Sequence, residues 1–213
     1  MNKKNTNYLP SLQLLFQQYG KKKHPLNYQN MYQLIVMVVL SAQTTDVLVN
    51  KIAPALFNQV PSMKHLAALH PEELYPWIKS VRGFRKKAEW LVKIAQILKD
   101  EKNLSFSINE LTKLPGIGRK SANVIIRESG GTPQGIIVDL HVVRVVPRLG
   151  ITNETTPEKI EASLMEIIPQ KYWNDAGMSL SFLGRECCRP TDPHCTACVM
   201  NRVCNYCRTN KLA

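Results

Sequence analysis

Apolar residues recur with the period of an α-helix along most of the chain. A first stripe with the spacing i, i+3, i+4, i+7 stops at Gly20 and consists of Leu12, Leu15, Phe16 and Tyr19. A second stripe lies in residues 90–98 and consists of Trp90, Leu91, Ile94, Ile97 and Leu98. A stripe of this width predicts a helix that packs against a core by one side.

Other segments add helices of different kinds. Residues 31–42 are apolar nearly all round, which predicts a helix buried within a domain. Pro76 interrupts an otherwise helical stretch over 72–81 and should shorten or kink it. Residues 155–158 read as a capping box before a helix that carries Ile160, Leu164, Ile167 and Ile168. The segment 135–138 is too short to anchor a sheet, so the chain is predicted to be all-α.

The charge of the chain favours a polyanionic partner. Its 28 Lys and Arg residues outnumber 16 Asp and Glu residues, which gives a formal net charge of +12. Nucleic acid is the commonest such partner, and an anionic membrane surface is the competitor. No apolar run approaches the ~18 residues of a membrane span, and residues 1–7 do not begin a secretory signal. We therefore expect a cytoplasmic protein with no membrane partner.

All six cysteines lie between residues 187 and 207. Clustered thiols in a reducing compartment favour metal ligation over disulfides, because thiolates are soft ligands for zinc or iron–sulfur clusters. The spacing C-x6-C-x2-C-x5-C joins Cys188, Cys195, Cys198 and Cys204. Four ligands within one compact loop suit a cubane cluster, whereas zinc sites usually use two separated pairs of ligands. Zinc remains the alternative, because His194 could complete a zinc site. Cys187 and Cys207 are left over, and an exchange of ligand between Cys187 and Cys188 stays open.

Residues 114–118 read Leu-Pro-Gly-Ile-Gly and predict a tight turn between two helices, the second of which starts at Arg119 or Lys120. We expect Gly116 and Gly118 to supply positive φ angles and close backbone approach. Turn amides and the first N–H groups of the next helix then form a phosphate site that binds DNA without reading its sequence. The alternative is a structural helix–turn–helix that binds no ligand.

These motifs resemble a known family. Residues 114–120 are similar to the helix–hairpin–helix of DNA glycosylases, and residues 130–139 look like their Gly/Pro-rich loop ending in an aspartate, here Asp139. The cysteine spacing and residues 40–46 (Leu-Ser-Ala-Gln-Thr-Thr-Asp) resemble the endonuclease III branch.

The resemblance implies a two-domain all-α fold. A six-helix barrel would span residues 26–135, with the helix–hairpin–helix at about 107–128. Residues 1–25 and 136–213 would form a discontinuous domain that holds a [4Fe–4S] cluster in the loop 188–204. DNA would lie in the cleft between the domains, where Lys120 and Asp139 would face each other. The implied partner is duplex DNA that contains damaged bases or abasic sites, bound by a monomer associated with a bacterial nucleoid.

Lys120 and Asp139 carry the expected chemistry. A neutral lysine amine can attack C1′ of a deoxyribose and expel the base, and the resulting Schiff base permits β-elimination that cuts the strand on its 3′ side. The neighbouring Arg119 would favour the neutral amine. Asp139 can stabilise positive charge at C1′ or move protons, and it can also act as the N-cap of a helix over 140–147. Without the resemblance, Lys120 would be a solvated first-turn lysine.

The target base must leave the stack before C1′ is reached, so a side chain has to fill the gap. By resemblance Gln43 is the expected plug, and an ordinary helix-end glutamine is the alternative. The loop 81–88 would supply a second wedge, for which Phe84 is the candidate, although Gly83 is shifted from the family's usual position. Its basic residues read as phosphate contacts or a solvated face: Arg82, Arg85, Lys86 and Lys87.

The sequence therefore predicts a bifunctional DNA glycosylase and AP lyase of base excision repair that acts on oxidised or ring-saturated pyrimidines. The expected DNA contacts are Gln43, Phe84, Leu114, Gly116, Gly118 and Arg119. A monofunctional glycosylase of the adenine-mismatch type is the alternative enzyme, and it is disfavoured by the presence of Lys120. A non-catalytic iron–sulfur DNA-binding protein is the alternative from another class, and it would need neither Lys120 nor Asp139.

Overall fold

A computed structural model describes residues 8–210, and the described part of the chain is built from helices and turns without a β-strand. The prediction of an all-α protein is confirmed. The outermost residues assigned to the predicted cluster domain, 1–7 and 211–213, lie outside the described residues. None of the helices in residues 8–210 is both long and apolar enough to cross a membrane.

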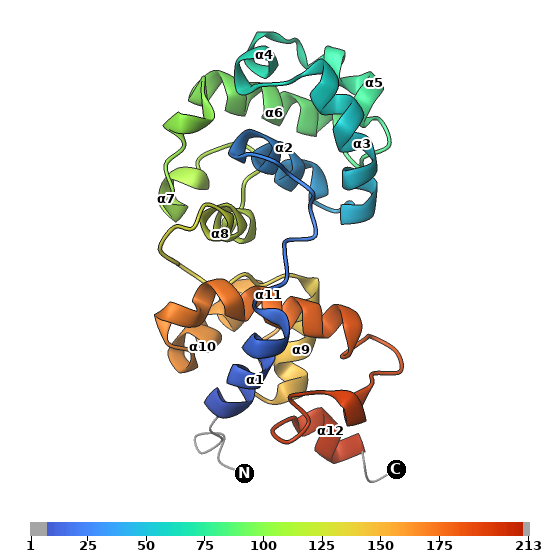
Figure 1. Cartoon of the computed structure of the whole chain (residues 1–213), viewed down its shortest axis with the longest axis vertical. Helices are drawn as coiled ribbons and strands as arrows, with labels where there is room; N and C mark the ends of the chain where they lie inside the picture. Colours follow the sequence, from blue (N-terminus) through green and yellow to red (C-terminus); the bar gives the residue numbers. More distant parts are fainter. Residues whose placement is uncertain (1–7, 211–213) are drawn as a thin grey trace. The chain divides into compact units, whose positions relative to one another are not determined.

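The chain divides into two compact units (Figure 1). The central unit, His24–Thr132, contains α2 (Met31–Ser41), α3 (Asp46–Gln59), α4 (Met63–Ala68), α5 (Tyr75–Ile78), α6 (Phe84–Leu98), α7 (Ile108–Leu111) and α8 (Arg119–Glu128). The terminal unit joins residues 8–23 to residues 133–210. It contains α1 (Leu9–Tyr19), α9 (Leu140–Leu149), α10 (Pro157–Ile167), α11 (Trp173–Glu186) and α12 (Asn205–Asn210).

The core of the central unit forms around α2. Asn30 caps this helix by accepting a hydrogen bond from the Gln33 amide, and residues 34–40 are all buried. The helix is apolar all round because α3, α6 and α8 each pack against it. The predicted buried helix is therefore confirmed, and its C-terminus carries the turn that contains Gln43.

The terminal unit is built on the packing of α11 against α9 and α1. Gly184 permits a close crossing of α9 and α11, because a Cβ atom there would lie 2.8 Å from the Cβ of His141. This approach brings the last two turns of α11 beside the first turn of α9, where Asp139 lies.

Three prolines lie at or near predicted helix boundaries. Pro76 lies in the first turn of α5, which follows a separate 3₁₀ turn over Pro71–Leu74, so the predicted interruption is confirmed. The predicted capping box at 155–158 is wrong: Pro157 occupies the first helical position, Thr156 becomes the N-cap, and no side chain caps α10. The predicted stop at Pro147 is also wrong, because α9 continues to Leu149 and ends at Gly150, where φ is +84°.

Candidate functional site

The hairpin of residues 108–128 consists of α7, a tight turn and α8. The Leu114 amide donates to the Leu111 carbonyl at 3.1 Å, and the Ile117 amide donates to the Leu114 carbonyl at 3.2 Å. Leu114 and Ile117 are buried, so apolar packing fixes the turn from the inside. The helix α8 then begins at Arg119, as the sequence predicts.

The two glycines of the turn have different roles. Gly116 has φ of +77°, and a Cβ atom there would lie 2.4 Å from Cε3 of Trp90, so the turn packs directly on the indole of α6. The expected positive φ of Gly118 is wrong: this residue is the extended N-cap of α8, with φ −89° and ψ 177°. A Cβ atom at Gly118 would meet no heavy atom within 4 Å. Gly116 therefore serves the fold, whereas Gly118 leaves the start of α8 open.

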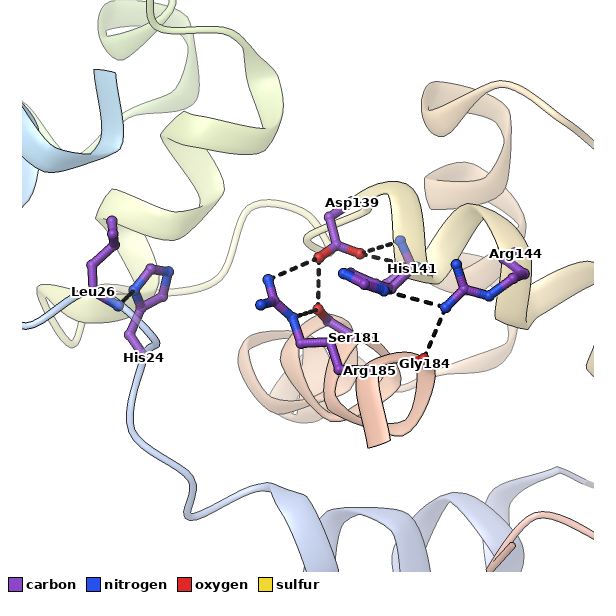
Figure 2. A network of polar contacts seen from close by, with 9 residues as sticks. His24, Leu26, Asp139, His141, Arg144, Ser181, Gly184 and Arg185 are labelled. Carbon is purple, nitrogen blue, oxygen red and sulfur yellow. Dashed lines mark hydrogen bonds and ion pairs between the residues drawn. The ribbon is translucent and has the colours of Figure 1, made fainter. Parts of the chain in front are cut away.

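Lys120 and Arg119 are both exposed in the first turn of α8. His24, at the start of the central unit, is electrostatically coupled to Lys120. Burial lowers the pKa of His24 to about 4, with an opposing effect from Glu128 and a smaller lowering from the Lys120 charge. The imidazole is therefore neutral at pH 7, and its Nδ1 accepts a hydrogen bond from the Leu26 amide at 3.1 Å (Figure 2). No sequence motif marks His24 as a residue near Lys120.

Asp139 is held at both carboxylate oxygens (Figure 2). Its Oδ1 accepts hydrogen bonds from the amides of His141 at 2.9 Å and Val142 at 3.0 Å, which makes it the N-cap of α9. Its Oδ2 accepts a hydrogen bond from the Ser181 hydroxyl at 2.6 Å. Nη2 of Arg185 lies 3.9 Å from the same oxygen. These hydrogen bonds fix the direction of the carboxylate, and the side chain remains accessible because it is still 13% exposed.

Sequence inspection alone missed the α11 partners of Asp139. Ser181 and Arg185 lie one turn apart on α11, and the Arg185 Nε donates to the Ser181 hydroxyl at 3.4 Å. Arg144 extends the same network, since it donates to the Gly184 carbonyl at 2.8 Å and to the Cys188 carbonyl at 3.1 Å. His141, whose amide binds Asp139, lies with its Nδ1 3.2 Å from Nη2 of Arg144, so the carboxylate is connected through His141 and Arg144 to Cys188, the first cysteine of the predicted cluster loop.

Gln43 lies exposed in the turn between α2 and α3, and its φ of +56° is unusual for a residue other than glycine. Phe84 begins α6 and packs edge-on against Tyr75, with ring centroids 5.1 Å apart. Arg82, Arg85 and Lys86 are exposed, as predicted. Lys87 is an exception: it is only 4% exposed, so the expectation of a phosphate contact or a solvated face is wrong for this residue.

All six cysteines line a single cavity in the terminal unit. Its other walls come from α9 and α11 and from the loop and α12 that follow, through Val145, Leu149, Leu183, Pro193, His194, Asn201 and Tyr206. Cys187, Cys204 and Cys207 are buried. Burial, followed by the proximity of four other cysteines, raises the pKa of the Cys195 thiol. The fold therefore gathers thiols that lie up to twenty residues apart in the sequence.

The donor set fits an iron–sulfur cluster by its chemistry. Thiolates are soft ligands, and the apolar walls of the cavity suit a cluster that must be shielded from water. Among residues 8–210, no group of three or more His, Cys, Asp or Glu side chains is arranged so that it could hold a metal ion. The described structure thus brings the four predicted ligands to one cavity.

Comparison with protein families gives a match over residues 36–170 to the family described as HhH-GPD superfamily base excision DNA repair protein. The chain is 37% identical over 191 residues to endonuclease III of Synechocystis sp., with 86% of this chain and 87% of that protein covered. It is 32% identical over 200 residues to endonuclease III of Escherichia coli, with 92% and 94% covered.

Solved structures show the same likeness. A trapped covalent endonuclease III–DNA intermediate superposes with a TM-score of 0.87 at 33% identity and covers 99% of both chains. A thermostable thymine-DNA glycosylase superposes with a TM-score of 0.76 at 19% identity, covering 95% of both chains, and shares the fold. The match spans both units of the described chain.

Proposed function

The chain belongs to the HhH-GPD superfamily of base excision DNA repair proteins and is a DNA glycosylase with AP lyase activity, and we propose that Lys120 is its nucleophile. We further propose that its substrates are oxidised or ring-saturated pyrimidines in duplex DNA. The observation that carries the assignment of Lys120 is its exposed position in the first turn of α8, directly after the tight turn of the hairpin.

The proposed reaction begins with attack of the neutral Lys120 amine on C1′ of the damaged nucleotide. The C1′–N bond breaks, its electron pair leaves with the base, and the base takes up a proton. The amine loses its proton, the C1′–O4′ bond breaks with its electron pair going to O4′, which takes up a proton, and an iminium forms at C1′. Loss of a C2′ proton then expels the 3′ phosphate oxygen, which cuts the strand by β-elimination.

Asp139 would assist this reaction through its carboxylate. The negative charge stabilises positive charge that develops at C1′, and the second oxygen can accept the proton that the amine releases. The hydrogen bonds from His141, Val142 and Ser181 fix the direction in which this group points. A fixed carboxylate needs no reorganisation during the reaction, which favours catalysis.

The DNA backbone would be held by the hairpin, with Gly118, Arg119 and the turn residues Leu114 and Gly116 against a phosphate. The side chain of Leu114 is buried, so its contact would come from the backbone. Gln43 would fill the gap that the flipped base leaves, and Phe84 would be the weaker candidate for a second wedge. We propose a monomer on damaged or abasic duplex DNA.

The central unit, with its hairpin, would be the barrel domain and the terminal unit the cluster domain. Cys188, Cys195, Cys198 and Cys204 would hold a [4Fe–4S] cluster with one thiolate per iron. The bound cluster would cross-link the end of α11 to the C-terminal segment. Cys187 and Cys207, which line the same cavity, would remain thiols.

Incision of a duplex with one thymine glycol, a ring-saturated pyrimidine, tests this proposal. The wild-type protein should release the base and cut the strand, and Lys120→Ala should bind the duplex without cutting it. Lys113→Ala is the matched control, since Lys113 is an exposed hairpin lysine whose ammonium pairs with Glu110 at 2.7 Å. Removal of a mismatched adenine without strand cutting would instead identify the monofunctional type of glycosylase.

A further inference from the structure

Lys87 is a buried cation whose hydrogen bonds go to the end of α2 and to the turn that follows it. The side chain lies in the first turn of α6 and is 4% exposed. Its ammonium donates to the carbonyls of Leu40 at 2.8 Å and Ala42 at 2.5 Å, and to the Thr44 hydroxyl at 3.3 Å. These three oxygens are neutral and stand on both sides of Gln43.

The turn that Lys87 contacts has a strained backbone. The helix α2 ends at Ser41, Gln43 takes φ of +56°, and α3 starts after its N-cap, Thr45. A non-glycine residue persists in the left-handed region when its surroundings over-determine it. The ammonium supplies such a constraint, because it fixes the residue before Gln43 and the residue after it.

The C-terminal end of α2 explains why a cation is favourable at this position. The last carbonyls of a helix lack intrahelical partners and form the negative end of its dipole, so an ammonium at the end of α2 is favourable there. Burying a lysine is nevertheless costly, and burial lowers the pKa of Lys87 to about 8. An apolar side chain would fill the space without that cost, which indicates that the ammonium is retained for what it holds in place.

We propose that Lys87 is a positioning residue that holds the turn 42–45 in the conformation that presents Gln43 to the gap in the DNA. It also ties this turn to the start of α6, where Gly83 and Phe84 lie, so that one ammonium links the two segments that we propose to contact DNA. The inference rests on the proposed role of Gln43 as the plug.

Binding to two duplexes tests this inference, one undamaged and one carrying a tetrahydrofuran abasic analogue that cannot react. The readout is the ratio of the two dissociation constants, because a lower fraction of folded protein changes both constants equally. Lys87→Met should reduce the preference for the abasic duplex about tenfold, which corresponds to ~1.4 kcal/mol. Lys87→Arg, which keeps a cation with N–H donors, should restore part of the preference. Lys93→Met is the matched control, because Lys93 is an exposed lysine of the same helix.

The double variant with Gln43→Ala identifies the route of the effect. If Lys87 acts through Gln43, the double variant loses no more preference than Gln43→Ala alone. An additive loss, or an unchanged ratio in Lys87→Met, would overturn the inference. A Gln43→Ala variant with an unchanged ratio would instead remove the plug assignment. If Lys87→Met does not fold, Thr44→Val is the second variant, because it removes one acceptor of the ammonium at a half-buried position. It should lower the preference for the abasic duplex by about threefold. An unchanged preference in Thr44→Val would contradict the positioning role of Lys87.

Discussion

The two glycines of the hairpin turn allow stability and DNA binding to be separated by substituting each with alanine. At Gly116 the added Cβ has two costs. The left-handed backbone at φ +77° is unfavourable for alanine by about 1–2 kcal/mol. The atom would also lie 2.4 Å from the Trp90 ring, and such overpacking costs typically about 1–3 kcal/mol. Gly116→Ala should therefore destabilise the central unit by about 2–5 kcal/mol.

Gly118→Ala should leave stability nearly unchanged. The backbone at φ −89° and ψ 177° suits alanine, and the Cβ would meet no atom of the protein. Alanine is a poorer N-cap than glycine, but it also reduces the entropy of the unfolded chain, so we expect a net change within ~0.5 kcal/mol. The new methyl group would stand at the start of α8, where a phosphate is proposed to lie.

Thermal unfolding and binding to an undamaged duplex measure the two effects. At roughly 2–4 °C per kcal/mol for a chain of this size, Gly116→Ala should lower the melting temperature by about 4–20 °C. Gly118→Ala should leave the melting temperature unchanged and weaken binding to the undamaged duplex about tenfold. Undiminished DNA binding by Gly118→Ala would refute the proposed phosphate site, since it would mean that no DNA backbone approaches the start of α8.

Three further predictions concern the groups around the site. Ser181→Ala removes the 2.6 Å hydrogen bond to Asp139. Because hydrogen bonds to charged groups contribute ~1.5–3 kcal/mol, we expect single-turnover cutting of an abasic duplex to slow by about tenfold or more. An unchanged rate would show that α11 does not position the carboxylate. Iron analysis should find about four iron atoms per chain with acid-labile sulfide, lost in Cys198→Ser and kept in the matched control Cys207→Ser; full occupancy by zinc would contradict the cluster. The pKa of Lys87 is lowered from 10.5 to about 8, so the unfolded chain binds this proton more tightly, and the free energy of unfolding should rise between pH 8 and 10.5 by on the order of 3 kcal/mol. That gain in the free energy of unfolding is complete above pH 10.5 and absent below pH 8. Urea unfolding should show the gain in the wild-type protein and not in Lys87→Met. The same dependence of the free energy of unfolding on pH in both proteins would disprove the burial of the charge.

Local sequence patterns predicted the helices and the hairpin because these depend on residues close together in the chain. The start of α8 follows from a glycine-rich turn before an apolar stripe, and the end of α9 at Gly150 has a similar local signal. The start of α10 shows the limit of such patterns. Thr155 and Thr156 are both candidate N-caps before Glu158, and Pro157 decides between them by occupying the first helical position.

Tertiary contacts account for most of what the sequence did not reveal. Ser181 is 42 residues from Asp139, and nothing in its neighbourhood marks it as a partner. Lys87 was predicted to be exposed because it lies in a basic run. Its spacing to Leu91, Ile94 and Leu98 places it on the buried stripe of α6, so helical periodicity carried a signal that composition concealed.

Borohydride trapping on a duplex with a single abasic site tests whether the Lys120 amine is the nucleophile. Borohydride reduces a Schiff base to a stable amine, so an amine nucleophile leaves a covalent protein–DNA band. We expect this band for the wild-type protein and for Lys113→Ala, and its absence for Lys120→Ala despite retained DNA binding. A band of undiminished intensity from Lys120→Ala would contradict the assignment of the nucleophile, and no band from the wild-type protein would contradict the amine mechanism itself.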